Sequence, residues 1–157
     1  MKQTIIIMMF MLGIIATTAQ AQNTKHFANY AGVSTSLSTP GDMTFTIEGG
    51  KWGNDVPLTV GASIDYVKNL HDGSMQSWWF GIKPYYTLYS QGKYACFVWF
   101  TPKIELTNLS NYLIENGVGL QKQMKDSPWY LWWMLGTQTG NGFSYVPSVS
   151  IGINYVK

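Results

Sequence analysis

The sequence predicts an all-β protein, a single eight-stranded antiparallel barrel connected up and down. Seven clusters of Gly, Pro, Asn, Asp and Ser, the residues that turns require, divide the chain after residue 21 into eight segments. Within these segments apolar and polar residues alternate with the period of two that strands have, and no sustained helical period occurs. The predicted strands span residues 28–38, 42–51, 56–69, 75–90, 93–106, 112–124, 129–139 and 143–156.

Composition excludes three classes of protein. Of the 157 residues only 11% are charged, against roughly 25% in a typical soluble domain. Aromatic residues make up 15%, which argues against disorder because disordered chains have few aromatics and a high net charge. All ten basic residues are Lys, so the Arg-containing basic patch of a nucleic-acid binder is missing. Cys96 is the only cysteine, which excludes a disulfide scaffold.

The first segment has the pattern of a secretory signal peptide. Lys2 supplies a positive charge, residues 5–15 are an almost unbroken apolar run, and Ala19-Gln20-Ala21 fits a small-x-small cleavage site. The run is shorter than the roughly 20 residues that a spanning helix needs. We therefore expect residues 1–21 to be removed on export and residues 22–157 to form one domain.

The two faces of the strands distinguish a membrane barrel from a soluble one. In residues 56–69 one face is apolar from Val56 to Tyr66, and the other carries Ser63 and Asp65 among small residues. Most polar faces contain Ser, Thr, Gly and Asn, whereas a face in bulk water would be rich in Lys, Glu and Asp. Small polar residues suit a narrow interior, so the apolar face points at lipid, as in a transmembrane β-barrel.

The outward aromatic residues are predicted to form two girdles with an aliphatic band between them. Amphipathic rings accumulate at both membrane interfaces, so this arrangement supports a spanning barrel. Near the end that carries both termini lie Phe27, Tyr86, Tyr94, Trp129 and Tyr155, and near the opposite end lie Tyr66, Trp78, Phe80, Tyr112 and Tyr145.

The whole predicted domain resembles the small eight-stranded outer-membrane barrels, the family of OmpX and the OmpA transmembrane domain. The last strand of that family carries a polar-x-Gly-x-x-aromatic-x-aromatic signal, which Ser150, Gly152 and Tyr155 match, whereas Lys157 departs from it. The resemblance implies a monomer in the bacterial outer membrane, placed there by the outer-membrane assembly machinery and surrounded by lipids and lipopolysaccharide. It implies no cofactor and no nucleic-acid partner.

A set of charged residues alternates onto the predicted inward face. Because an eight-stranded barrel is just wide enough for side chains to fill it, we expect these residues to form a polar network that plugs the lumen. An ion or proton pathway is the alternative function for the same residues. The set is Glu48, Asp65, Lys83, Lys103, Glu105 and Glu115.

Two alternatives to a structural or surface-contact role stay open. A secreted soluble barrel would use the face with Val60 and Ile151 to line an apolar pocket. A lipid A-modifying enzyme would use His71 and Ser74, although Asp-Gly between them is a common turn dipeptide. Two His and one Cys without ligand spacing predict no metal site.

Several strand features do not fit a simple pattern. Pro84, Pro102 and Pro147 fall inside predicted strands, where each proline removes a hydrogen bond from the ladder. The segment 129–139 is apolar on both sides, so its faces cannot be assigned from alternation.

Overall fold

The computed structural model describes residues 27–38, 41–70, 76–141 and 143–157. These residues form eight strands, which confirms the predicted fold class. The strands are β1 (Phe27–Ser38), β2 (Asp42–Gly53), β3 (Leu58–Asn69), β4 (Gln76–Gln91), β5 (Tyr94–Glu105), β6 (Tyr112–Gln123), β7 (Trp129–Gly140) and β8 (Phe143–Val156).

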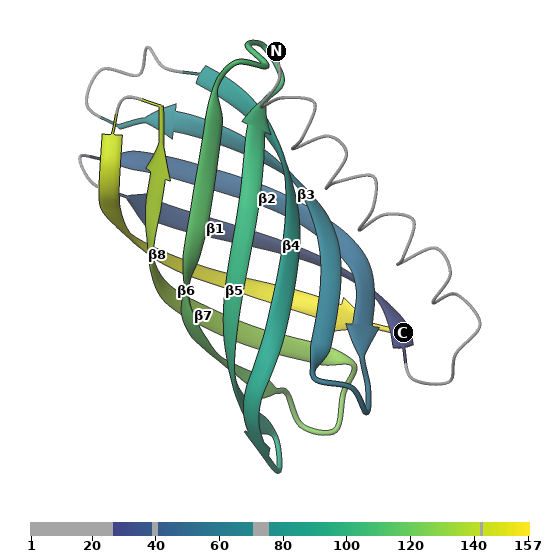
Figure 1. Cartoon of the computed structure of the whole chain (residues 1–157). Coiled ribbons are helices and arrows are strands. Elements are labelled where there is room, and N and C mark those ends of the chain that lie inside the picture. The colour runs from purple at the N-terminus through teal and green to yellow at the C-terminus, as the bar shows by residue number, and fades with distance from the viewer. Residues whose placement is uncertain (1–26, 39–40, 71–75, 142) are drawn as a thin grey trace.

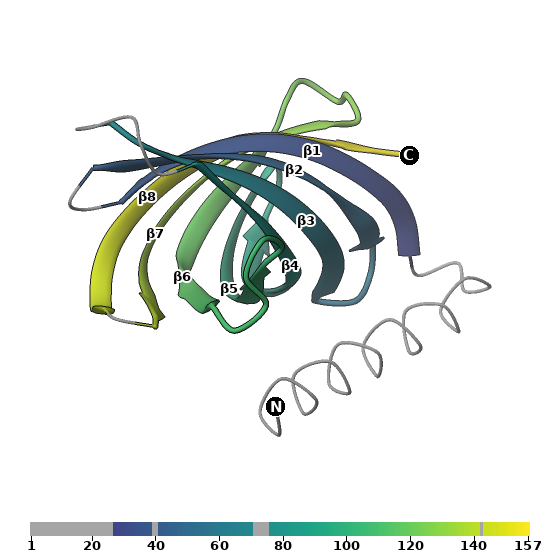
Figure 2. The same cartoon turned by 90° about the horizontal axis from the view of Figure 1, so that it is seen from above.

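Each strand pairs antiparallel with the next, and β1 pairs with β8 to close the barrel, whose tilted strands are seen in Figure 1 and Figure 2. The closing ladder runs from Tyr30 opposite Val156 to Ser38 opposite Ser148. Beyond it, Asn29 and Lys157 exchange backbone hydrogen bonds of 2.9 and 2.8 Å. Closure leaves no free sheet edge, which is the condition for strands to cross a bilayer.

The barrel has two ends, and each carries a different set of connections between strands. We call the end where β1 begins and β8 ends the terminus end, and the other the loop end. The connections 54–57, 92–93 and 124–128 lie at the terminus end, where Gly92 adopts a φ of 57° in the two-residue turn. The connections 39–41, 70–75, 106–111 and 141–142 lie at the loop end.

The observed strand boundaries fall within two residues of the predicted ones. The largest differences adjoin one turn: β2 continues to Gly53, and β3 begins at Leu58 instead of residue 56. The predicted place of Val56 on the outward face is therefore wrong, since Val56 belongs to the turn. Pro57 explains the late start, because proline has no N–H for the ladder and restricts the residue before it.

The barrel is apolar outside and polar inside at mid-height. Outward Ile47 and Leu135 are 70% and 60% exposed, whereas inward Ser63 and Thr101 are 1% and 0% exposed. The face with Val60 and Ile151 therefore does not line an interior pocket, which removes the basis for the soluble barrel. Within the described residues, no helix has the length and hydropathy needed to cross a bilayer.

All three prolines lie on the outward face of their strands. Pro147 pairs with Thr137, Pro84 with Val60 and Pro102 with Ile114. Between β4 and β5, however, paired residues stop at Gly81 opposite Lys103 and resume at Tyr85 opposite Trp99. Pro84 and Pro102 lie in this gap, and neither has an N–H group to donate. They therefore interrupt the ladder between β4 and β5, which we call the β4–β5 seam.

Candidate functional site in the barrel interior

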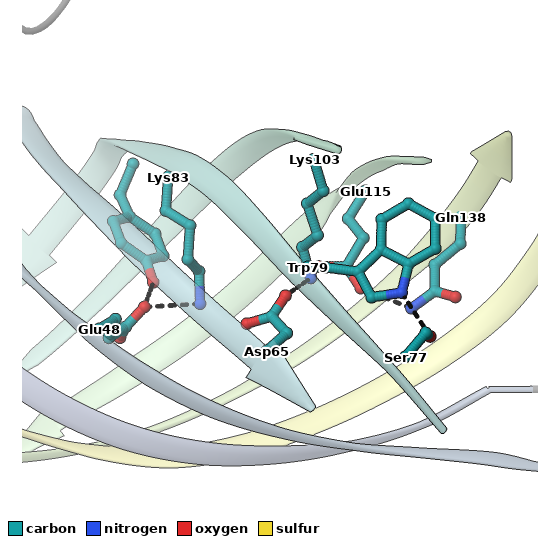
Figure 3. A network of polar contacts seen from close by, with 9 residues as sticks. Glu48, Asp65, Ser77, Trp79, Lys83, Lys103, Glu115 and Gln138 are labelled. Carbon is teal, nitrogen blue, oxygen red and sulfur yellow. Dashed lines mark hydrogen bonds and ion pairs between the residues drawn. The ribbon is translucent and has the colours of Figure 1, made fainter. Parts of the chain in front are cut away.

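A layer of buried charged groups crosses the barrel at mid-height (Figure 3). The Lys83 Nζ lies 2.6 Å from Glu48 Oε2, which also accepts a 2.8 Å hydrogen bond from the Tyr85 hydroxyl. Six consecutive strands, β2 to β7, each contribute one residue. We call this set the charged layer: Glu48, Asp65, Lys83, Lys103, Glu115 and Gln138.

Lys103 joins the second half of the charged layer. Its Nζ lies 2.5 Å from Asp65 Oδ2 and 2.7 Å from Glu115 Oε2. Gln138 Nε2 donates to Glu115 Oε1 over 2.5 Å, so the network extends onto β7. Figure 3 shows the side chains meeting across the interior from neighbouring strands.

The charged layer is buried and its charges nearly balance. The side chains of Glu48 and Asp65 have no exposed surface, and those of Lys83 and Lys103 are each 4% exposed. Three carboxylates face two ammonium groups, and pairing offsets much of the cost of removing these charges from water. The buried ion pairs meet in the interior at this height, and the plug expected from the sequence stays a prediction.

Glu105 does not join this layer. It lies at the end of β5, where its carboxylate accepts 2.6 Å hydrogen bonds from Thr107 Oγ1 and Asn111 Nδ2. Those partners belong to the connection 106–111, so Glu105 holds this connection against the end of β5. Alternation places Glu105 on the same inward face as Lys103, two residues earlier, and therefore cannot show that only Lys103 joins the charged layer.

A second interior layer, which sequence reasoning missed, is aromatic and lies on the terminus side of the charged layer. Lys83 links the layers, because its Nζ lies 5.5 Å from the Tyr85 ring centroid and 5.4 Å from that of Trp132. Such distances favour a cation–π interaction. We call this set the aromatic layer: Tyr30, Trp52, Tyr85, Phe97, Trp99, Trp132 and Met134.

The signal for the aromatic layer is present in the sequence. Trp52 lies an even number of residues after Glu48, and Tyr85 follows Lys83 by two, so alternation places both inward. The expectation of an interior of small polar residues hid this signal. The structure also assigns the faces of β7, with Trp132 inside and Leu135 outside.

Inward glycines make room for the large rings. A Cβ on Gly152 would lie 2.3 Å from Trp132 Cζ2, and a Cβ on Gly119 would lie 2.4 Å from Phe97 Cζ. Both distances are shorter than any carbon contact that packed atoms tolerate. Gly152, predicted as part of the assembly signal, therefore also accommodates the Trp132 ring.

The other members of the predicted assembly signal occupy β8. Ser150 points inward opposite Met134, and Tyr155 points outward with its ring centroid 5.0 Å from that of Trp129. These positions are compatible with the signal but do not test recognition by another protein.

The aromatic residues predicted for the membrane interfaces lie outside the barrel at both ends. Tyr66 and Trp78 pack with ring centroids 5.1 Å apart near the loop end. Of the others, Tyr86, Tyr94, Tyr112, Trp129 and Tyr145 are exposed, and Phe27, Phe80 and Tyr155 are partly exposed. Two rings of side chains result, although their role at a membrane interface stays a prediction.

A pocket of about 470 Å³ opens at the terminus end, next to the aromatic layer. Trp132, Tyr85 and Phe97 line its inner part. The connections 54–57 and 92–93 form part of its rim. We call it the vestibule.

The structure adds nothing to several predictions about reactive residues and the first segment. His71 and Ser74, residues 1–21 and the cleavage site lie outside the described residues. Cys96 is a free, half-buried thiol on the outward face of β5. In the described part of the chain, no group of three or more His, Cys, Asp or Glu side chains could hold a metal ion.

No protein-family model matches the sequence, and no curated protein matches it significantly. Solved structures do match. The N-terminal β-barrel domain of Pseudomonas aeruginosa OprF superposes with a TM-score of 0.57 at 11% identity, covering 83% of this chain and 97% of that one. A de novo designed transmembrane β-barrel matches with a TM-score of 0.55 at 16% identity, covering 85% and 98%. A second designed barrel, TMB2.3, gives 0.56 at 15%, covering 83% and 94%.

At these identities the comparisons show the fold, and they agree with the closed ladder and the apolar exterior. These three structures are covered almost completely, so the similarity extends over one whole barrel. The chain therefore has the fold of the small eight-stranded transmembrane β-barrels.

Proposed function

We propose that the protein is a monomeric barrel of the bacterial outer membrane with a closed lumen, a structural or surface-contact role and no catalytic activity. The observation that carries the proposal is the apolar exterior around a buried charged layer. Outward Ile47, Ile64 and Leu135 are 70%, 49% and 60% exposed at the height of the buried ion pairs. Such an exterior is stable in lipid and would aggregate in water.

The orientation follows from the even number of strands. Both termini lie at one end, which for an exported barrel is the periplasmic side, so the loop end faces outward with lipopolysaccharide as its surroundings. The outer-membrane assembly machinery would recognise Ser150, Gly152 and Tyr155 on β8. The outer connections are short, which favours local contacts with external molecules over a large adhesive surface.

A closed lumen is tested by conductance. The purified protein is inserted into planar bilayers beside a variant in which Glu48→Ala and Lys83→Ala remove one ion pair of the charged layer. We expect no discrete channel events from the wild-type protein, because paired side chains fill the lumen. Reproducible ion conductance through the wild-type barrel would contradict the plug and favour the ion pathway.

The absence of catalysis is tested on the lipid. His71→Ala and Ser74→Ala are expressed separately in cells, and the acyl pattern of lipid A is compared by mass spectrometry with that of cells carrying the wild-type protein or an empty vector. We expect four identical patterns. A change that requires the wild-type protein and disappears in either variant would show that the barrel is a lipid A-modifying enzyme.

A further inference from the structure

The vestibule has no part in the proposed function. It has about 470 Å³ of space, within the roughly 300–1,000 Å³ of small-molecule sites. Residues from β2 to β8 line it, so the pocket spans most of the barrel's circumference. Rings of the aromatic layer line its inner end, and the buried charged layer lies beyond them.

The lining combines aromatic rings with neutral hydrogen-bonding groups. Tyr130, which is half-buried, packs against Trp52 with ring centroids 4.8 Å apart. Gln121, Thr87 and Asn154 bring amide and hydroxyl groups to the same space. These groups both donate and accept hydrogen bonds.

The charge of the lining is close to zero. Among the described residues of the lining, Asp55 and Lys93 are the ones from the Asp, Glu, Lys and Arg set, and they carry opposite signs. Lys93 is further neutralised by Asp126, whose Oδ1 lies 2.8 Å from its Nζ. A phosphate or a polyanion would thus gain little electrostatic energy there. A lipid tail would leave the amides and hydroxyls of the pocket without partners, which costs free energy.

We propose that the vestibule binds a neutral sugar unit, as a mono- or disaccharide or as part of a glycan. The C–H face of a sugar ring stacks on aromatic side chains, and its hydroxyls both donate and accept hydrogen bonds, as the lining requires. The setting rests on the proposed function: in the orientation proposed above, the vestibule faces the periplasm and the glycan there.

The experiment is calorimetric titration of the folded, full-length mature protein in a zwitterionic detergent without a sugar headgroup. The probes are N,N′-diacetylchitobiose and maltose, both neutral disaccharides. We expect a dissociation constant of about 1 mM or tighter for at least one probe. Tyr130→Leu should weaken binding roughly tenfold, since it removes the stacking surface and keeps an apolar side chain.

Tyr112→Leu is the matched control, because Tyr112 is an outward tyrosine at the loop end, far from the vestibule. It should bind the probe as the wild-type protein does. Gln121→Ala is a second test if Tyr130→Leu fails to fold, and it should weaken binding by removing an amide of the lining.

No heat from either probe at concentrations of about 10 mM, well above the expected constant, would overturn the inference. Equal loss of binding in Tyr112→Leu and Tyr130→Leu would also overturn it, by showing that the sugar binds elsewhere. The membrane assignment is tested by two other measurements: whether the protein needs detergent to stay in solution, and whether boiling changes its gel mobility. Sugar binding by a protein that needs no detergent would keep the vestibule and reject the outer-membrane role.

Discussion

Lys103 is the residue on which the charged layer depends most, because its ammonium group contacts two carboxylates. Lys103→Met would leave Asp65 and Glu115 buried without their shared cation. We expect this variant to lose about 3–5 kcal/mol of unfolding free energy, as when one partner of a buried pair is removed. The measurement is urea unfolding in lipid vesicles, followed by tryptophan fluorescence.

Lys68→Met is the control for that change, since Lys68 is exposed near the loop end of β3. It should alter the unfolding free energy by less than about 0.5 kcal/mol. Adding Asp65→Asn and Glu115→Gln to Lys103→Met should restore much of the loss, because no buried charge then lacks a partner. A stable Lys103→Met single variant would show that the pairs do not form.

Gly152 gives a second prediction at the residue scale. A methyl group there would meet the Trp132 ring at 2.3 Å, so Gly152→Ala should cost about 1–3 kcal/mol by overpacking. The loss should persist when the denatured protein refolds in detergent without any assembly machinery. A stability equal to wild type in refolded Gly152→Ala, with poor assembly in cells, would assign Gly152 to the assembly signal alone.

Among the structural elements, the seam between β4 and β5 is the weakest part of the ladder. Counting from the pairs on either side places Pro102 opposite Ile82 and Pro84 opposite Phe100. Two carbonyl groups thus lose N–H partners within one short stretch, and no water is present in a bilayer core to replace them.

Hydrogen exchange measures this weakness directly. We expect the amides of Ile82 and Phe100, which face this seam, to exchange faster than those of Val118 and Leu135, which pair in the unbroken ladder of β6 and β7. Pro102→Ala restores one donor and should slow exchange at its neighbours. Uniform protection around the whole barrel would show that the prolines do not loosen the seam.

The same elements show how far sequence reasoning reaches. Alternation placed Ser63 and Asp65 inside and Ile64 outside because a strand has a strict period of two. Near the end of β4 a bulge lies between Thr87 and Tyr89, and the period shifts by one. Strict alternation cannot place such an extra residue, because the bulge belongs to the pairing of β4 with β5.

At the scale of the whole molecule, the fold was predictable and the interior only partly so. Seven turn clusters and the alternating faces of the eight strands specify an inside-out barrel regardless of individual contacts. Which inward residues meet depends on the stagger between strands, which a single sequence does not reveal. For this reason Glu48 and Lys83 were recognised as inward residues but not as a pair, and Glu105 was grouped with residues that it does not contact.

The central claim, a closed barrel with a lipid-facing exterior, is tested most directly by gel mobility. The membrane fraction is dissolved in SDS and run with and without boiling. Because every strand has two neighbours, we predict that the unboiled protein resists SDS and migrates as a compact species, and that boiling shifts it to the position of the unfolded chain. A single mobility in both lanes, with the protein recovered from the soluble periplasmic fraction, would contradict the account.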